Sequence, residues 1–153
     1  MKLIVFFTLL FGLIHSTASA TLPDIDGRWV GEGTYILDGE ITYCDHVELI
    51  FSSTDSEFIF ESGNRSCTKH NETFYRVSTE VANGEVSFAG MIVGEYTEST
   101  VQMGFRQPDG DTFRNWRMSL RRQGNHLMYE ESRTMDGETT PLISFAGVLV
   151  KQD

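Results

Sequence analysis

Large apolar residues alternate with polar ones along most of the chain after residue 26. Around residue 118, for example, Trp116, Met118 and Leu120 are each separated from the next by one polar residue. A period of two places such residues on one face of an extended strand. The apolar positions are also rich in Phe, Tyr, Val and Ile, which favour strands. The pattern therefore predicts an all-β chain.

Turn-forming residues recur about every ten positions, a spacing typical of an antiparallel meander. The turn signals are Asp38-Gly39, 52–55, Ser62-Gly63-Asn64, Asn83-Gly84, Gly94-Glu95, Pro108-Asp109-Gly110, Gly124-Asn125 and Asp136-Gly137. Between them we predict about nine strands. These cover residues 27–36, 41–51, 57–61, 73–79, 85–93, 96–105, 112–121, 126–135 and 142–151.

The connections between these strands are too short for crossover helices, so neighbouring strands must be antiparallel. A long open meander leaves two exposed edges, and closing the sheet removes them. We predict a single antiparallel up-and-down β-barrel of about eight to ten strands. A β-sandwich is the alternative, although it would usually show a longer Greek-key connection.

Residues 1–20 have the pattern of a secretory signal peptide. Lys2 is followed by an apolar run over residues 3–14, and Ala18-Ser19-Ala20 supplies small residues at the cleavage site. The run is shorter than the roughly 20 apolar residues that span a bilayer. The sequence thus predicts an exported protein, periplasmic or extracellular, with residues 21–153 as one domain.

The formal net charge is −10, and removal of Lys2 with the signal peptide makes it more negative. An acidic chain is repelled by nucleic acid and by anionic membranes, and it attracts cationic partners. No later stretch is apolar enough to cross a membrane. We expect a monomer with no nucleic-acid partner and no membrane span.

Two cysteines, Cys44 and Cys67, remain after residue 20. In an oxidising compartment an even number of cysteines indicates a disulfide. The alternative is a zinc site that adds His46 and His70 to the two thiols. Two glycosylation sequons, at Asn64 and Asn71, matter only in a eukaryotic host.

The segment Asp26-Gly27-Arg28-Trp29-Val30-Gly31-Glu32-Gly33 begins the first predicted strand. Its Gly-x-Trp resembles the first signature of lipocalins and their calycin relatives. The longer Gly-x-Trp-x-Gly-x-Gly resembles bacterial fatty-acid-binding-protein-like domains. This resemblance implies a barrel with Trp29 packed across one end. Two departures are that the chain ends in a strand pattern rather than a helix, and that residues 141–149 lack the His of haem-binding members. We therefore expect no haem and no other cofactor.

No catalytic constellation stands out among residues 21–153. Only three histidines follow the predicted signal peptide, and no Gly-x-Ser-x-Gly nucleophile motif is present. We expect a non-enzymatic barrel that binds a small apolar or amphipathic molecule in its interior. The alternative is an acidic protein-binding barrel, such as an inhibitor of a cationic secreted enzyme.

The expected ligand-binding residues are those that alternation places on inward faces, while Trp29, Cys44 and Cys67 are expected to be structural. The ligand-binding set is Tyr43, Val47, Phe58, Phe60, Phe88, Met103, Trp116, Met118 and Tyr129. Glu131 shares the face of Tyr129, so it needs a cationic partner such as Arg133, Arg117 or Arg121. The sequence leaves open whether the interior is a cavity or is filled by these side chains.

Overall fold

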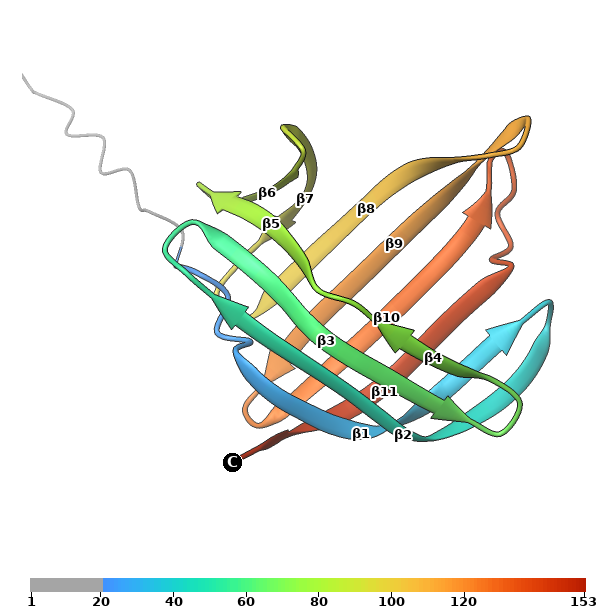
Figure 1. The fold of residues 1–153 in the computed structure, drawn as a ribbon, viewed down its shortest axis with the longest axis horizontal. Helices are drawn as coiled ribbons and strands as arrows, with labels where there is room; N and C mark the ends of the chain where they lie inside the picture. The colour runs from blue at the N-terminus through green and yellow to red at the C-terminus, as the bar shows by residue number, and fades with distance from the viewer. Residues whose placement is uncertain (1–20) are drawn as a thin grey trace, which may run out of the picture.

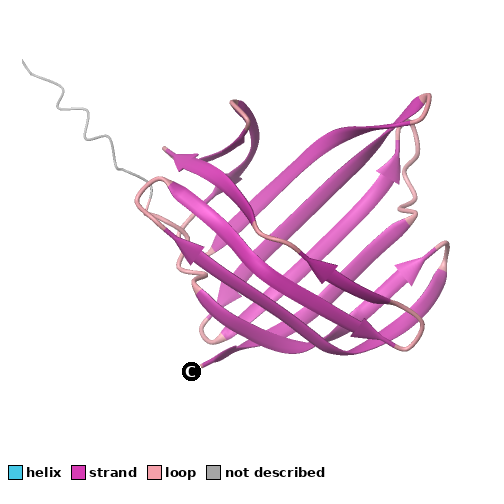
Figure 2. Cartoon of the chain, in the orientation of Figure 1, coloured by secondary structure: helices cyan, strands magenta, loops and turns pink. Residues whose placement is uncertain are grey.

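The computed structural model describes residues 21–153, which form eleven strands and no helix (Figures 1 and 2). The predicted signal peptide lies outside the described residues. Within them, no helix is long and apolar enough to cross a membrane. The strands are β1 (Gly27–Leu37), β2 (Glu40–Ser53), β3 (Glu57–Cys67), β4 (Asn71–Phe74), β5 (Val77–Ala82), β6 (Glu85–Phe88), β7 (Met91–Tyr96), β8 (Thr100–Asp109), β9 (Thr112–Gln123), β10 (His126–Met135) and β11 (Ile143–Gln152).

The strands form one antiparallel sheet that closes on itself. Its order is β2-β1-β11-β10-β9-β8-β7-β6-β5-β3-β4, and pairing between β2 and β3 completes the ring. Ten strands make the barrel, and β4 is an additional strand on β3. Strand β4 pairs with residues 63–66 of β3, whereas β5 pairs with residues 57–60. The predicted antiparallel barrel of eight to ten strands is therefore confirmed.

Several predicted strand ends are wrong. The predicted turn at Ser62-Gly63-Asn64 lies inside β3, and the one at Gly94-Glu95 lies inside β7. The predicted strand 85–93 is instead two strands, because Ala89 and Gly90 adopt positive φ values of 51° and 77° and turn the chain. The predicted strand 73–79 is likewise divided between β4 and β5. Local glycine content was a poor guide to turns in this region.

One end of the barrel is closed by a plug of apolar side chains. Trp29 is completely buried there, and its indole N–H donates to the Ile25 carbonyl at 2.7 Å. Ile25 is itself buried, and Leu22 packs against the same core. The Asp24 backbone N–H donates to the Glu98 carbonyl at 2.8 Å, which holds the plug across the barrel end. Trp29 is therefore buried where the segment before β1 crosses the barrel, which fits its expected structural role.

A β-bulge displaces the register of β2. Cys44 is paired with Cys67 and His46 with Ser66, so Asp45 is an extra residue in the ladder. Cys44 and Cys67 both face inward and form the predicted disulfide. The zinc alternative, which required both thiols, is therefore wrong. Because the bulge reverses the alternation of side chains, Tyr43 lies outside the barrel, and its hydroxyl donates to the Glu32 carboxylate.

Candidate functional site

The barrel interior contains a cavity of about 490 Å³. Aromatic and aliphatic side chains contributed by strands from β2 to β10 make most of its wall, and Glu131 and Arg133 are its two charged residues. The lining residues are Leu49, Phe51, Phe58, Phe60, Thr73, Phe74, Tyr75, Val77, Thr79, Phe88, Val93, Met103, Phe105, Gln107, Trp116, Met118, Tyr129, Glu131 and Arg133. Ligand pockets in proteins typically measure roughly 300–1,000 Å³, so this cavity can hold a small molecule.

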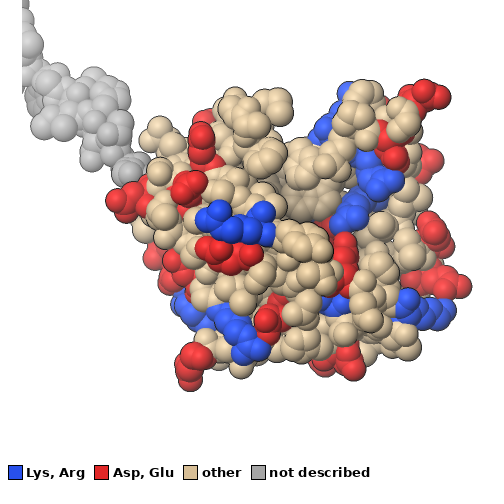
Figure 3. Space-filling model, in the orientation of Figure 1, with Lys and Arg blue, Asp and Glu red and all other residues tan. Residues whose placement is uncertain are grey.

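The cavity opens where the sheet is incompletely paired. Strand β8 pairs with β7 only from Val101 to Met103, and beyond that it pairs with β9 alone. Strand β4 pairs only with β3 within the described residues. Tyr75, Phe88 and Phe105 line the cavity here and are exposed. Figure 3 shows the surface hollowed between the β6–β7 and β8–β9 hairpins. We call this opening, lined by Tyr75, Val77, Phe88 and Phe105, the mouth.

Seven of the nine residues predicted to bind a ligand lie together on the cavity wall. They are Phe58, Phe60, Phe88, Met103, Trp116, Met118 and Tyr129. Val47 is buried in the core but does not line the cavity. Tyr43 is outside the barrel, and its assignment to the interior is wrong because of the bulge at Asp45.

The glycines in the strands do not create this cavity. A Cβ atom at Gly33 would lie 2.4 Å from the Phe145 ring, so this glycine makes room for that ring. Gly104 and Ala146 line a hollow on the outside of the barrel instead. The cavity opens beside the incompletely paired strands β4 and β8, which the sequence pattern did not indicate.

Two arginines and two glutamates form a charged cluster beside the cavity: Arg65, Glu72, Glu131 and Arg133. Arg65 is 1% exposed and binds both glutamates, with Glu131 at 3.3 Å. Arg133 donates to Glu131 at 2.8 Å and to Glu72 at 3.3 Å. Each guanidinium thus contacts both carboxylates, and the cluster has no formal net charge. Buried ions of opposite sign must be paired in this way to be tolerated.

The Glu131 carboxylate is the centre of this cluster. Besides the two arginines, it accepts hydrogen bonds from the Tyr129 hydroxyl at 2.7 Å and the Trp116 indole at 3.0 Å. Burial would raise the pKa of Glu131, but the charge of Arg65 and the hydrogen bond from Tyr129 together lower it below its usual value. Burial and the neighbouring Glu131 raise the pKa of Tyr129 well above its usual value. Glu131 is consequently an ionised acceptor whose oxygens are already occupied.

Arg65 was not among the predicted partners of Glu131. Of the three arginines named from the sequence, Arg133 is confirmed, and no hydrogen bond or salt bridge joins Glu131 to Arg117 or Arg121 within residues 21–153. The Arg65 guanidinium lies over the rings of Tyr35, Phe74 and Phe145, at 4.6–5.0 Å from their centroids. Its Nε and Nη1 atoms are buried without a hydrogen-bond partner in the described chain. Cation–π contacts with three rings offset part of that cost.

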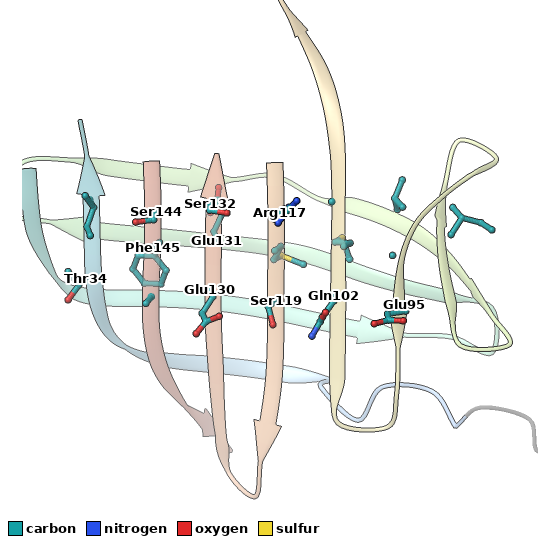
Figure 4. Close-up of a pocket in the computed structure, with 18 of the residues that line it drawn as sticks. Thr34, Glu95, Gln102, Arg117, Ser119, Glu130, Glu131, Ser132, Ser144 and Phe145 are labelled. Carbon is teal, nitrogen blue, oxygen red and sulfur yellow. The ribbon is translucent and has the colours of Figure 1, made fainter. Parts of the chain in front are cut away.

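A second hollow lies on the outer surface of the sheet, across β1, β11, β10, β9, β8 and β7 (Figure 4). Short polar side chains such as Thr34, Ser119, Ser132 and Ser144 are among the residues that line it. Glu95, Glu130 and Gln102 stand in one row across neighbouring strands, with Arg117 beside them. This surface is open to solvent and is more acidic than basic.

Comparisons with protein families, with curated protein sequences and with solved structures find no match to this chain. Within residues 21–153, no three or more His, Cys, Asp or Glu side chains come together in a group that could hold a metal ion.

Proposed function

We propose that this protein is a binding protein whose barrel interior takes a small amphipathic molecule. The observation that carries the proposal is the cavity of about 490 Å³, which is apolar over most of its wall and opens at the mouth. Burying apolar surface contributes roughly 25 cal/mol per Å², so an aliphatic or aromatic ligand body gains affinity along this wall.

The charged cluster orients the ligand. A polar group of the ligand that entered the cavity would meet Arg133 and Glu131, which both line it. Because the Glu131 oxygens already accept several hydrogen bonds, they are poor acceptors for a further donor. Arg133 is only partly buried and offers donors. The ligand therefore carries a hydrogen-bond acceptor at one end and an apolar body at the other.

Titration with the apolar fluorescent dye Nile red tests this proposal. We expect saturable binding with one site per chain. Met103→Trp adds a bulky ring on the cavity wall and should weaken binding about tenfold or more, which corresponds to ~1.4 kcal/mol. Gln102→Trp is the matched control, because the neighbouring side chain points outward into the other hollow.

The proposal is wrong if the folded wild-type protein binds no Nile red. It is equally wrong if the two tryptophan variants lose binding to the same extent, since the dye would then be bound outside the cavity. Circular dichroism of each variant separates loss of binding from loss of fold.

A cationic protein partner is the second candidate function. The outer hollow presents Glu85, Glu95 and Glu130 against a single cation, Arg117, in a chain with a formal net charge of −10. Opposite charges accelerate association, and this effect weakens with salt. Binding of a cationic secreted enzyme that is lost in a Glu95→Gln, Glu130→Gln variant would support this function, and unchanged binding would exclude this surface.

A further inference from the structure

Six large apolar side chains are exposed around the mouth, and we call them the apolar rim: Tyr75, Val77, Phe88, Met91, Ile92 and Phe105. Tyr75 is 80% exposed, Met91 63% and Ile92 65%. Four of the six line the same cavity, and Phe88 pairs with Met91 across the β6–β7 hairpin. Ile92 follows Met91 in β7 and also lines the outer hollow. Contiguous exposed apolar surface on a soluble domain usually marks an interaction site.

The β6–β7 hairpin makes part of the rim project outward from the barrel. Its turn, at Ala89-Gly90, stands off the barrel wall in Figure 1. The segment from Ser87 to Gly94 contains no charged residue, although 22% of the chain is charged. The surface over this hairpin is correspondingly uncharged in Figure 3. The tip is therefore a small apolar projection on an otherwise acidic molecule.

We propose that the apolar rim docks onto the surface of a lipid bilayer without net charge, with the tip of the β6–β7 hairpin inserted among the headgroups. A convex, uncharged tip makes no ion pairs, and a fluid apolar interface accommodates it without a matching pocket. Tyr75, with an apolar ring and a polar hydroxyl, suits the boundary between headgroups and hydrocarbon. The net charge of −10 selects a zwitterionic surface over an anionic one.

Docking in this way would place the mouth against the lipid. Tyr75, Val77, Phe88 and Phe105 belong both to the rim and to the cavity wall. A sparingly soluble amphipathic molecule could then pass between bilayer and cavity without crossing water. This last step rests on the proposed ligand-binding function, whereas docking itself does not.

Flotation with phosphatidylcholine vesicles tests the docking. We expect the wild-type protein to float with the vesicles, and the bound fraction to change little with salt because no ion pairs are involved. The double variant Met91→Asp, Ile92→Asp should reduce the partition coefficient about tenfold or more, since two charges enter the interface. The matched control is Ile41→Asp on the β1–β2 hairpin, which is 72% exposed but lies outside the rim, and it should change partition less than about twofold.

Three results would overturn the proposal: no flotation of the folded wild-type protein, equal losses in the double variant and the control, or preferential binding to anionic vesicles. Sedimentation velocity provides a further test. A wild-type dimer that becomes a monomer in the double variant would mean that the rim binds a second copy instead of lipid.

Nile red titration without vesicles distinguishes the docking proposal from the ligand-binding proposal. Met91 and Ile92 do not line the cavity, so dye binding should survive in the variant that no longer floats.

Discussion

The two ends of the barrel are built in opposite ways. At the closed end, Trp29 and Ile25 are completely buried, and the chain before β1 crosses the barrel and hydrogen-bonds to the Glu98 carbonyl. At the mouth, strand edges remain unpaired and apolar rings are exposed, and the cavity behind it is bordered by buried charged side chains. Each of these mouth features is unfavourable for folding when taken alone.

The contrast indicates that one end of the barrel mainly stabilises the fold, whereas the other is suited to binding. We expect much of the folding stability to come from the apolar plug and the strand pairing around it, because Trp29 and Ile25 are completely buried there. That stability offsets the cost of the exposed apolar rings at the mouth and of the buried charged cluster beside the cavity. In our proposal the ligand enters at the mouth. Local strain and instability are commonly found at binding sites for this reason.

The largest effect is expected at the closed end. Trp29→Ala removes a fully buried ring and its hydrogen bond to Ile25, and it should lower the free energy of unfolding by about 3–5 kcal/mol. Urea unfolding measures this change. A loss below ~1 kcal/mol would mean that the plug contributes little and that the contrast between the ends is wrong.

Removal of the buried arginine should have the next largest effect. Arg65→Met keeps the packing volume, but within residues 21–153 it leaves Arg133 as the one arginine paired with Glu131 and Glu72, so we expect a loss of about 3 kcal/mol. Urea unfolding again provides the measurement. The control Arg76→Met removes an exposed ion pair with Glu61 and should cost less than about 1 kcal/mol. Equal losses would show that the buried charged cluster contributes no more to the free energy of unfolding than an exposed ion pair does.

Glu131→Gln should cost about 2 kcal/mol at neutral pH, because a carboxylate with charged and neutral donors is replaced by an amide. It should also change the pH dependence. The pKa of Glu131 is lowered in the folded protein, so its ionised form stabilises the fold above the ordinary pKa of a glutamate, and this contribution is lost as the pH falls through the lowered pKa. The free energy of unfolding, measured from pH 7 down to pH 3, should therefore decrease more steeply in the wild type than in the variant. Parallel curves would contradict the assignment.

The smallest effect is expected at the outer edge of the mouth. Tyr75→Ser removes an 80% exposed ring, so the free energy of unfolding should change by no more than about 0.5 kcal/mol. Thermal or urea unfolding can verify this. A large loss would show that Tyr75 packs on the barrel, and that the mouth contributes to stability after all.

Much of the fold could be predicted from residue alternation and turn chemistry. Pairs such as Asp38-Gly39 and Asn83-Gly84 adopt the positive φ values that such turns require. Other turns use different chemistry. At residues 97–100 the hydroxyl of Thr97 accepts backbone N–H groups of Ser99 and Thr100, so the turn forms without glycine and was not predicted.

The site was harder to predict than the fold, because it depends on long-range register. Of the nine residues that alternation within the strands predicted for the cavity wall, seven line it. Tyr43 does not, because the bulge at Asp45 reverses the direction of its side chain. Arg65 was missed because the polar run before it resembled a turn. Once Cys67 is taken as inward-facing, Gly63 and Arg65 share its face, and this was the available signal.

The incomplete strand pairing at the mouth has a mechanical consequence. A closed barrel resists widening because every strand is tied to two neighbours by backbone hydrogen bonds. Between β4 and the distal part of β8, no such pairing joins the two sides in the described chain. The circumference can therefore increase there while every ladder stays intact, at the expense of side-chain contacts alone. We therefore expect the barrel to be stiffer at its plugged end than at the mouth, and the largest ligand of our proposal to be set by this flexibility as well as by the cavity volume of about 490 Å³.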